Sequence, residues 1–296
     1  MGFECYHPAI NCIYFVCMFT GTFLFRHPVF LLISWLSAFL YSVKRNRLRS
    51  LVFNLCLIPL AVLFACYYSG YNHFGVTVLR YNFIDNRMTL ESLLYGLTLG
   101  IQAAACIMWF TCLFSVFTTD KVVYLFGRVS PKASLFLAIA LRMCPRVKAQ
   151  GKKISTARKA IGMGANQGNL FRRLRNAVCI FSMSLTWLLE SFSSVSDSMR
   201  SRGYGLKGRT AFSIYRFDNR DRSFVIGIFT CFTVVIMGMM LDQTAMSFAP
   251  RIRMTPITPL SCLFYAGYLG LCLLPPALEL ISELHFRRLR KGLLRE

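Results

Sequence analysis

The sequence predicts an all-α integral membrane protein with about six transmembrane helices and a helical cytoplasmic domain inserted between the fourth and fifth spans. Two properties of its 296 residues lead to this prediction: 55% are hydrophobic, and 34 Lys and Arg stand against 12 Asp and Glu. A soluble protein with so many apolar residues would expose large apolar patches, which such proteins rarely do. Both properties are compatible when apolar runs cross a bilayer and basic residues occupy the loops.

The first three predicted spans follow one another closely. The first covers residues 9–25 and the second 28–43, and the junction between them contains Pro28. Such a short connection predicts a helical hairpin within the membrane. The third span, 51–69, begins after a basic cluster between residues 44 and 49.

The remaining three spans flank a long basic segment. After a polar stretch at 70–88, a fourth helix is expected over 89–117, with Thr89 as its N-cap. The fifth and sixth spans are expected over 223–241 and 259–281. A basic tail follows the last of them.

The distribution of charge predicts the orientation. Residues 118–222 hold 20 of the 34 Lys and Arg, and short basic loops stay on the cytoplasmic side of a membrane. We therefore expect both termini in the cytoplasm, with a four-span bundle over 1–117, a cytoplasmic domain over 118–222, and a transmembrane hairpin with its tail over 223–296. The span count is less definite around 133–144, an apolar patch that could enter the membrane partway.

A heptad-like series predicts a long helix over residues 170–200. Its apolar positions alternate at spacings of three and four, which is typical of a helix face that packs on another helix. These positions are Phe171, Leu174, Val178, Phe181, Leu185, Leu188, Phe192, Val195 and Met199. Three arginines at 172, 173 and 175 crowd the helix start, where the helix dipole disfavours cations. They indicate contact with anionic lipid headgroups or with an acidic partner.

The end of this helix carries a candidate functional arginine. Three residues beyond Met199 the series reaches Arg202, and Gly203 follows as a predicted C′ cap. From the residues alone, Arg202 is either a partner contact or a cation that stabilises a helix C-terminus by about 0.3–1 kcal/mol. The G-x-G-x-x-G pattern at 203–208 closes a helix, whereas a dinucleotide site follows a strand and opens one. A capped turn is therefore expected there.

A second cytoplasmic helix, poorer in apolar residues, is expected over 146–161. Pro145 lacks an amide hydrogen, so it is expected to separate this helix from the apolar patch before it. Gly162, Gly164 and Gly168 then predict a flexible junction to the long helix.

Several kinds of chemistry lack their characteristic residues in this sequence. The 12 Cys are scattered without a Cys-x-x-Cys pair and the four His lie far apart, so neither disulfides nor a metal site is expected. The P-loop signature is absent, and no nucleophile–base arrangement stands out. We therefore predict no catalytic residue, no cofactor and no metal. Positive charge without a base-stacking fold does not predict a nucleic-acid partner.

The segment from Asp197 to Gly205, which follows a long amphipathic helix, resembles the T component of energy-coupling factor transporters, the EcfT/CbiQ family. That family carries an Ala-Arg-Gly signature at the tip of each of two coupling helices. The second signature corresponds to Ser201-Arg202-Gly203. The first corresponds to Ala160-Ile161-Gly162, where isoleucine replaces the arginine and either Arg158 or Lys159 would supply the charge. The resemblance extends to His7-Pro8, Thr118-Thr119-Asp120, and Leu141-Arg142 with Pro145.

The resemblance implies a coupling subunit in the plasma membrane of a prokaryote. Two ABC-type ATPase subunits would receive the helix tips. A small membrane S component would bind the bundle and the apolar series, for uptake of a vitamin or another micronutrient. A T component dedicated to nickel or cobalt is the alternative within the family. Outside it, the alternatives are a membrane enzyme acting on lipids and a membrane anchor for a nucleic-acid complex.

Overall fold

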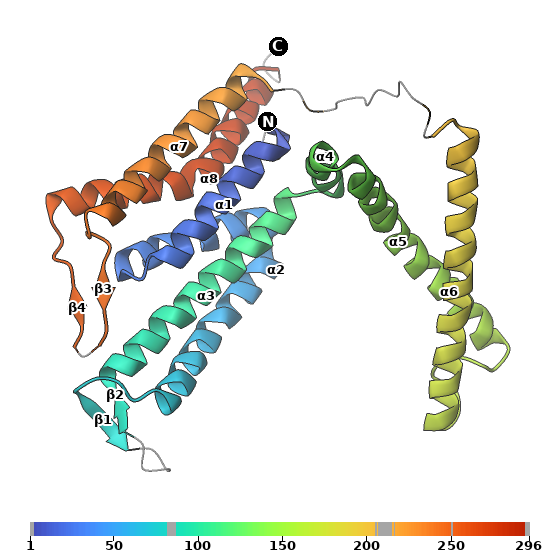
Figure 1. The fold of residues 1–296 in the computed structure, drawn as a ribbon, viewed down its shortest axis with the longest axis horizontal. Coiled ribbons are helices and arrows are strands. Elements are labelled where there is room, and N and C mark those ends of the chain that lie inside the picture. Colours follow the sequence, from blue (N-terminus) through green and yellow to red (C-terminus); the bar gives the residue numbers. More distant parts are fainter. Residues whose placement is uncertain are drawn as a thin grey trace. The chain divides into compact units, whose positions relative to one another are not determined.

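The computed structural model describes residues 3–81, 87–204, 206, 215, 217–249 and 251–293 (Figure 1). The chain divides into two compact units, one formed by residues 1–118 with 215–296 and the other by residues 119–214. The helices are η1 (Phe3–Cys5), α1 (Pro8–Leu24), α2 (Pro28–Tyr71), α3 (Leu90–Val116), α4 (Thr119–Val129), α5 (Pro131–Ala160), α6 (Leu170–Ser201), α7 (Asn219–Met240) and α8 (Pro259–Leu293). The strands are β1 (Val78–Tyr81), β2 (Arg87–Thr89), β3 (Met246–Ser247) and β4 (Arg253–Met254).

The predicted all-α membrane architecture is confirmed. Five helices of the described chain, α2, α3, α6, α7 and α8, are long and apolar enough to cross a bilayer, and α1 is apolar but only 17 residues long. The count of six spans stays a prediction. Helix α6, which we expected in the cytoplasm, meets the same length and composition criteria, and α2 is counted once although it contains a turn.

Helix α2 folds back on itself at Arg47. This residue has φ 53° and ψ −136°, values that no helix contains. The Ser42 and Ser50 hydroxyls share a hydrogen bond, although eight residues along a straight helix would span about 12 Å. The sequence predicted two helices joined by a basic loop. The structure restricts the break to Arg47, so most of that basic cluster is helical.

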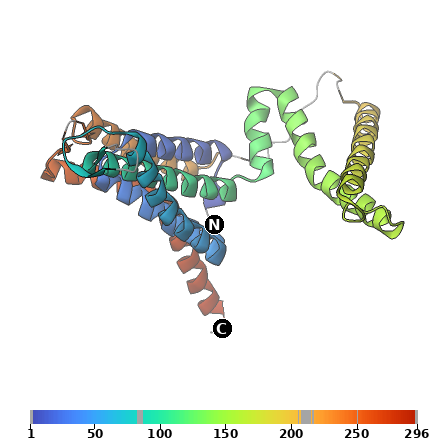
Figure 2. The same cartoon turned by 90° about the horizontal axis from the view of Figure 1, so that it is seen from below.

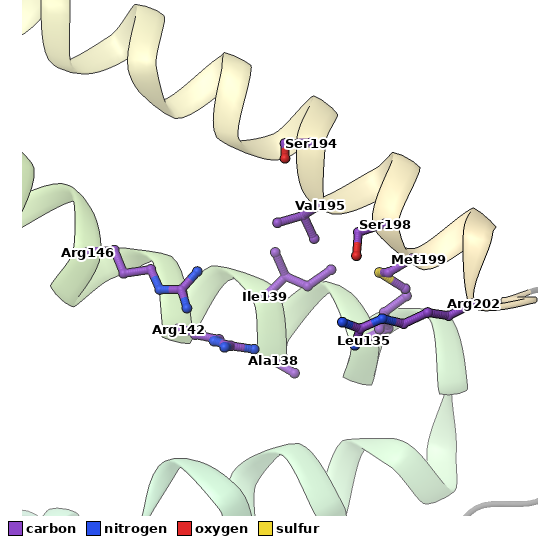
Figure 3. Close-up of a pocket in the computed structure, with 10 residues that line it drawn as sticks. All are labelled: Leu135, Ala138, Ile139, Arg142, Arg146, Ser194, Val195, Ser198, Met199 and Arg202. Atoms are coloured by element: carbon purple, nitrogen blue, oxygen red, sulfur yellow. The ribbon is translucent and has the colours of Figure 1, made fainter.

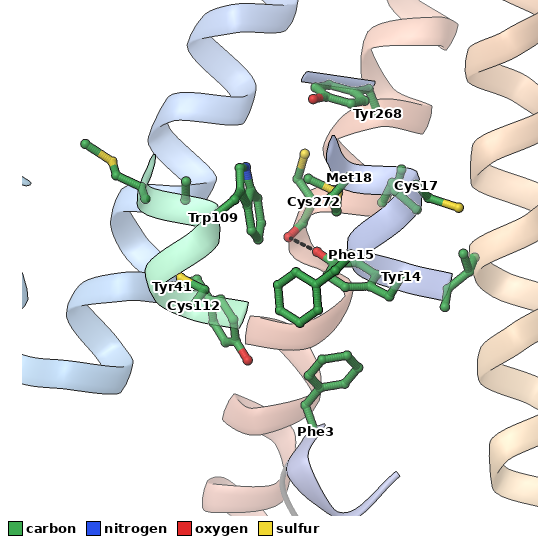
Figure 4. Close-up of a cluster of buried hydrophobic side chains, with 14 of the residues drawn as sticks. Phe3, Tyr14, Phe15, Cys17, Met18, Tyr41, Trp109, Cys112, Tyr268 and Cys272 are labelled. Atoms are coloured by element: carbon green, nitrogen blue, oxygen red, sulfur yellow. Dashed lines mark hydrogen bonds between the residues drawn. The ribbon is translucent and has the colours of Figure 1, made fainter. Parts of the chain in front are cut away.

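An aromatic core joins four helices of the first unit. Tyr14 of α1, Tyr41 of α2, Trp109 of α3 and Tyr268 of α8 are fully buried (Figure 4). The indole Nε1 of Trp109 donates to the Ser34 hydroxyl at 3.1 Å, and the Tyr14 hydroxyl donates to the Cys272 carbonyl at 3.5 Å. The large aromatic side chains of the apolar runs therefore hold segments together that lie far apart in the sequence.

Small residues allow close contact between α3 and the second arm of α2. A Cβ on Gly96 would lie 3.0 Å from the Ala65 carbonyl oxygen, and one on Gly100 would lie 2.7 Å from the Ala61 carbonyl oxygen. Both pairs have the spacing of small residues four apart that brings helices together in membranes. This packing places the two backbones nearly in contact.

Two polar groups within the predicted spans support the bundle. The Gln102 amide donates to the carbonyls of Thr22 at 2.8 Å and Phe23 at 2.9 Å, and so satisfies the end of α1. Glu279 of α8 is buried, and its Oε1 lies 3.6 Å from Arg45 Nη1. These contacts give both residues a structural role.

Two short antiparallel hairpins connect helices of the first unit. Strand β1 pairs with β2, with Tyr81 opposite Arg87, and β3 pairs with β4, with Met246 opposite Met254. The sequence predicted only a polar stretch before α3. The N-cap of α3 is as predicted, since the Thr89 hydroxyl accepts from the Ser92 amide at 3.4 Å. Beyond the bundle, the last turns of α8 extend away from the other helices (Figure 2).

The second unit consists of α4, α5 and α6. Helices α4 and α5 form a hairpin around Ser130 (Figure 2), and the Ser134 hydroxyl of α5 donates to the Val123 carbonyl of α4 at 2.8 Å. The boundary predicted at Pro145 is wrong, because α5 runs without interruption through this residue. A proline removes one hydrogen bond from a helix, and the other bonds of this 30-residue helix maintain it.

Candidate functional site

Helix α6 ends in a Schellman motif at the Ser201-Arg202-Gly203 triplet. Gly203 has φ +74°, its amide donates to the Arg200 carbonyl at 3.0 Å, and the Tyr204 amide donates to the Met199 carbonyl at 3.0 Å. This pattern satisfies the last carbonyls of a helix and requires a residue that tolerates positive φ, which glycine does. Gly203 is therefore the C′ cap that the sequence predicted. Gly205 and Gly208 of the glycine pattern lie outside the described residues.

Helix α5 ends in the same motif at the Ala160-Ile161-Gly162 triplet. Gly162 has φ +76°, its amide donates to the Lys159 carbonyl at 3.1 Å, and the Met163 amide donates to the Arg158 carbonyl at 2.9 Å. The two triplets thus have equivalent backbone geometry, position by position. Ile161 on α5 corresponds to Arg202 on α6.

The two helix ends expose different side chains. At the end of α5, Ile161 is 74% exposed and Met163 is 54% exposed, so this surface is apolar. At the end of α6, Arg202 is exposed beside Tyr204, and Leu206 follows. One end offers an apolar contact and the other combines a charge with apolar groups.

Arg158 places its guanidinium group at the end of α5. Its Nε donates to the Met163 carbonyl at 3.4 Å, and its Nη1 lies 4.0 Å from the Met183 sulfur of α6. Lys159, the other candidate for the missing charge, is exposed. Arg158 is therefore tied to its own turn, whereas the Lys159 side chain faces solvent.

A polar contact holds the loop that follows the end of α5. The Asn176 side chain is the buried residue of α6, and its Nδ2 donates to the Gly164 carbonyl at 3.1 Å. The Gln167 Oε1 accepts from the Gly164 amide at 2.8 Å. The sequence predicted a flexible junction here and did not indicate these two residues. Single polar residues that join a helix to a loop do not recur at a regular spacing. The spacing of residues in the sequence therefore could not predict these contacts.

The apolar series of α6 is largely uncovered in this chain. Phe171 is 83% exposed and Phe181 is 69% exposed, whereas Val195 and Met199 face α5. The exposed members of the series are Phe171, Leu174, Val178, Phe181, Leu185 and Phe192, and Leu188 is half-buried. An apolar stripe of this length is typical of a helix face that packs on a partner.

Arg202 lies back over α5 in this structure. Its side chain extends from the end of α6 across Leu135 and toward Arg142, along a groove between the two helices (Figure 3). A contact with a partner would instead require this side chain to project beyond the helix end. Its exposure allows either orientation, because a rotation about its side-chain bonds moves the guanidinium group by several ångströms.

The described residues contain no cluster of metal-ligating side chains. No group of three or more His, Cys, Asp or Glu residues comes together among them. All 12 cysteines are free, and several of them are buried among apolar side chains of the first unit. The arrangement of α5 and α6 instead provides two exposed helix ends and an exposed apolar stripe, which are features of a binding surface.

Comparison with known proteins points to one family. The chain is 33% identical over 89 residues to the energy-coupling factor transporter transmembrane protein EcfT 1 of Listeria monocytogenes, covering 30% of this chain and 34% of that protein. The resemblance to energy-coupling factor T components is confirmed. The EcfT proteins of Lactococcus lactis subsp. cremoris and Lacticaseibacillus paracasei are 33% identical over 98 residues and 32% identical over 89 residues.

The similarity to EcfT proteins is partial. It covers 32% of this chain and 36% of the L. lactis protein, and 30% of this chain and 34% of the L. paracasei protein. The chain therefore matches about a third of the length of these curated relatives. No protein-family model matches the chain. The relatives are named as transmembrane proteins of a transporter, which agrees with the apolar helices of this chain.

Proposed function

We propose that this protein is the coupling subunit of an energy-coupling factor transporter in the plasma membrane of a prokaryote. The observation that carries the proposal is the pair of equivalent helix endings at Ile161 and Arg202 in a chain similar to EcfT proteins. Two helices that end in one geometry and expose those ends suit docking onto two similar partner surfaces. Two ABC-type ATPase subunits are such partners.

The two helix ends act as docking elements in this proposal. Each end enters a groove on one ATPase subunit, in the manner of a helix-in-groove contact. The end of α6 brings the positive charge of Arg202 to an acidic groove, and charge complementarity of this kind sets specificity. The end of α5 docks by apolar contact through Ile161 and Met163, with Lys159 as the nearby exposed cation.

The exposed stripe of α6 binds the S component in this proposal. Burial of Phe171, Leu174 and Phe181 against a membrane partner removes three large and exposed apolar side chains of this helix from solvent. ATP-driven closure of the ATPase pair moves the docked helix ends. Because Arg158 of α5 contacts Met183 of α6 and Asn176 of α6 holds the loop after α5, this motion reaches the stripe and reorients the S component, which releases a vitamin or another micronutrient inside.

The chain itself has no catalytic part in this function. Its partners bind and hydrolyse ATP, and the S component binds the substrate, so the chain needs no cofactor and no nucleic acid. Both termini and residues 118–222 lie in the cytoplasm in this arrangement. The orientation rests on the 20 basic residues of that segment.

Purification of the tagged protein in a mild detergent from its native membrane tests the proposal. We expect two ABC-type ATPase chains and one small membrane protein to co-purify, and ATPase activity to be present in the complex and absent from the chain alone. Co-purification of neither ATPase, or saturable micromolar ATP binding by the isolated chain, contradicts the proposed function.

A further inference from the structure

A groove of about 480 Å³ lies between α5 and α6 within the second unit (Figure 3). Three arginines reach it: Arg142 and Arg146 from successive turns of α5, and Arg202 from the end of α6. No acidic side chain is among the residues that line it. The groove therefore concentrates positive charge without any compensating group of its own.

The three guanidinium groups have no partner within the part of the chain that the structure describes. None of the three side chains forms a hydrogen bond or an ion pair there. Other arginines differ: Arg45 pairs with Glu279, and Arg173 donates to the Gly168 carbonyl at 3.0 Å. Unpaired like charges in one groove repel each other, and an anion with several oxygens relieves that repulsion.

The floor of the groove is apolar. Leu135, Ala138, Ile139, Val195 and Met199 line it, and the hydroxyls of Ser194 and Ser198 lie along the α6 side (Figure 3). A ligand that matches both the three arginines and the apolar floor carries an anionic group at one end and a hydrocarbon chain at the other. Guanidinium groups bind phosphate oxygens in pairs, so phosphate suits the charged end.

The surroundings of the groove favour a lipid over a soluble anion or an acidic peptide. Phe136 of α5 is exposed next to the floor residue Leu135, and Phe192 and Leu189 continue the apolar surface along α6. A free phosphate ion uses none of this surface. An acyl chain does, and a membrane protein with a basic segment meets anionic lipids in its own bilayer.

We propose that this groove binds one anionic phospholipid. Its phosphate lies among Arg142, Arg146 and Arg202, and one acyl chain covers Ile139 and Val195. The proposal concerns the chain with the end of α6 undocked, because Arg202 cannot hold the lipid phosphate and lie in an ATPase groove at the same time. It assigns a role to Arg142 and Arg146, which the proposed docking does not use.

Native mass spectrometry of the full-length protein in detergent, titrated with phosphatidylglycerol, tests this proposal. The variant R142Q/R146Q removes two of the three charges and leaves Arg202 for docking. The matched control K148Q/K152Q makes the same charge change at the same spacing on α5, at residues that do not line the groove. Each lost hydrogen bond to a charged group weakens binding about tenfold. We expect at least this weakening in R142Q/R146Q and none in the control.

A second variant, Ala138→Trp, fills the floor and keeps every charge, so it separates loss of the site from misfolding of R142Q/R146Q. We expect it to reduce retention of phosphatidylglycerol while the circular dichroism spectrum stays helical. Phosphatidylcholine, inorganic phosphate and polyglutamate are the competitors. Equal weakening in both double variants, no effect of Ala138→Trp, or full displacement by phosphate or polyglutamate would overturn the lipid assignment.

Discussion

Ile161 and Arg202 occupy the same position of two equivalent helix endings and have opposite character. Both are the last residue before a glycine with positive φ, so the difference between them comes from the side chain alone. Because backbone geometry is shared, substitutions at these two positions compare charge with apolar contact directly.

Arg202→Glu should abolish binding of the ATPase subunits, and Arg202→Ala should weaken it by about 2–5 kcal/mol, because truncation leaves a partner carboxylate buried without its charge. The measurement is co-purification of the ATPase chains together with uptake. Lys148→Glu, an equal charge change in the middle of α5, is the control and should bind normally. Normal complexes and normal uptake with Arg202→Glu would mean that Arg202 does not bind an ATPase subunit and only stabilises the end of its own helix.

Ile161→Asp should weaken assembly, because it places a charge in an apolar contact. Ile161→Arg should be tolerated, since this change restores the residue that the family signature carries. Co-purification of the ATPase chains with each variant measures the difference. If Ile161→Asp assembles and transports as the wild type does, the end of α5 does not occupy a groove.

His27 makes the free energy of unfolding depend on pH. Its side chain is fully buried between α1 and α2, and this burial lowers the pKa of the imidazole below its usual value of 6.5. The unfolded chain therefore takes up a proton at a higher pH than the folded chain, so stability falls as the pH drops below about 6.5. The melting temperature in detergent should decrease between pH 7 and pH 5.

The variant His27→Asn isolates this contribution. The His27 Nδ1 accepts from the Val29 amide at 3.4 Å, and asparagine is also a good N-cap residue, so the helix start is preserved. The variant should lose part of the pH dependence, and its stability should otherwise fall by a similar amount at every pH because the buried contact of His27 with Tyr265 is lost. An identical pH profile for wild type and variant would show that His27 does not titrate differently on folding.

At the scale of elements, α2 and α3 approach as closely as their backbones allow. Gly100→Ala places a methyl group 2.7 Å from the Ala61 carbonyl oxygen, so the two helices must separate. We expect a loss of about 1–3 kcal/mol, as for other overpacked sites. Thermal unfolding in detergent measures it. Gly227→Ala on α7 is the control, since nothing lies within 4 Å of its added Cβ; equal effects of the two changes would contradict close packing at Gly100.

Helix α6 shows how composition alone can leave two interpretations open. Its length and hydropathy suit a membrane span, yet Glu190 and Asp197 interrupt it and its apolar side chains lie along one stripe. A helix with one apolar stripe packs on a partner or along an interface. Charges that would face hydrocarbon on the opposite side make a crossing costly.

The topology of the whole molecule follows if α6 does not cross the membrane. A single cysteine at Asn166, in a Cys-depleted background, should react with an impermeant thiol reagent only from the cytoplasmic side. A cysteine at His73, in the exposed loop before β1, should react only from outside. Labelling of both positions from the same side would mean that a helix between them has been counted wrongly. A cysteine at Tyr204, which follows α6, should react from the cytoplasmic side like Asn166, and labelling of Tyr204 only from outside would mean that α6 crosses the membrane.

The sequence alone determined where most of the long apolar helices lie and how α6 ends. Three features depend only on neighbouring residues within one helix, where the geometry repeats with a known period. They are the apolar runs, the spacing of the α6 series and the glycines at 162 and 203. Residue order was also enough to indicate a resemblance to energy-coupling factor T components, because the triplet at 201–203 is local. These properties follow from local sequence and do not require tertiary packing.

Only the tertiary structure decided how separate segments meet. In the structure, the turn of α2 is restricted to Arg47 and α5 continues through Pro145. Arg202 lies along the groove between α5 and α6, which Arg142 and Arg146 also line. Each of these outcomes depends on contacts between residues distant in the sequence. Such contacts depend on side-chain volume, close packing and unpaired charge in three dimensions. The spacing of residues along the sequence does not predict them.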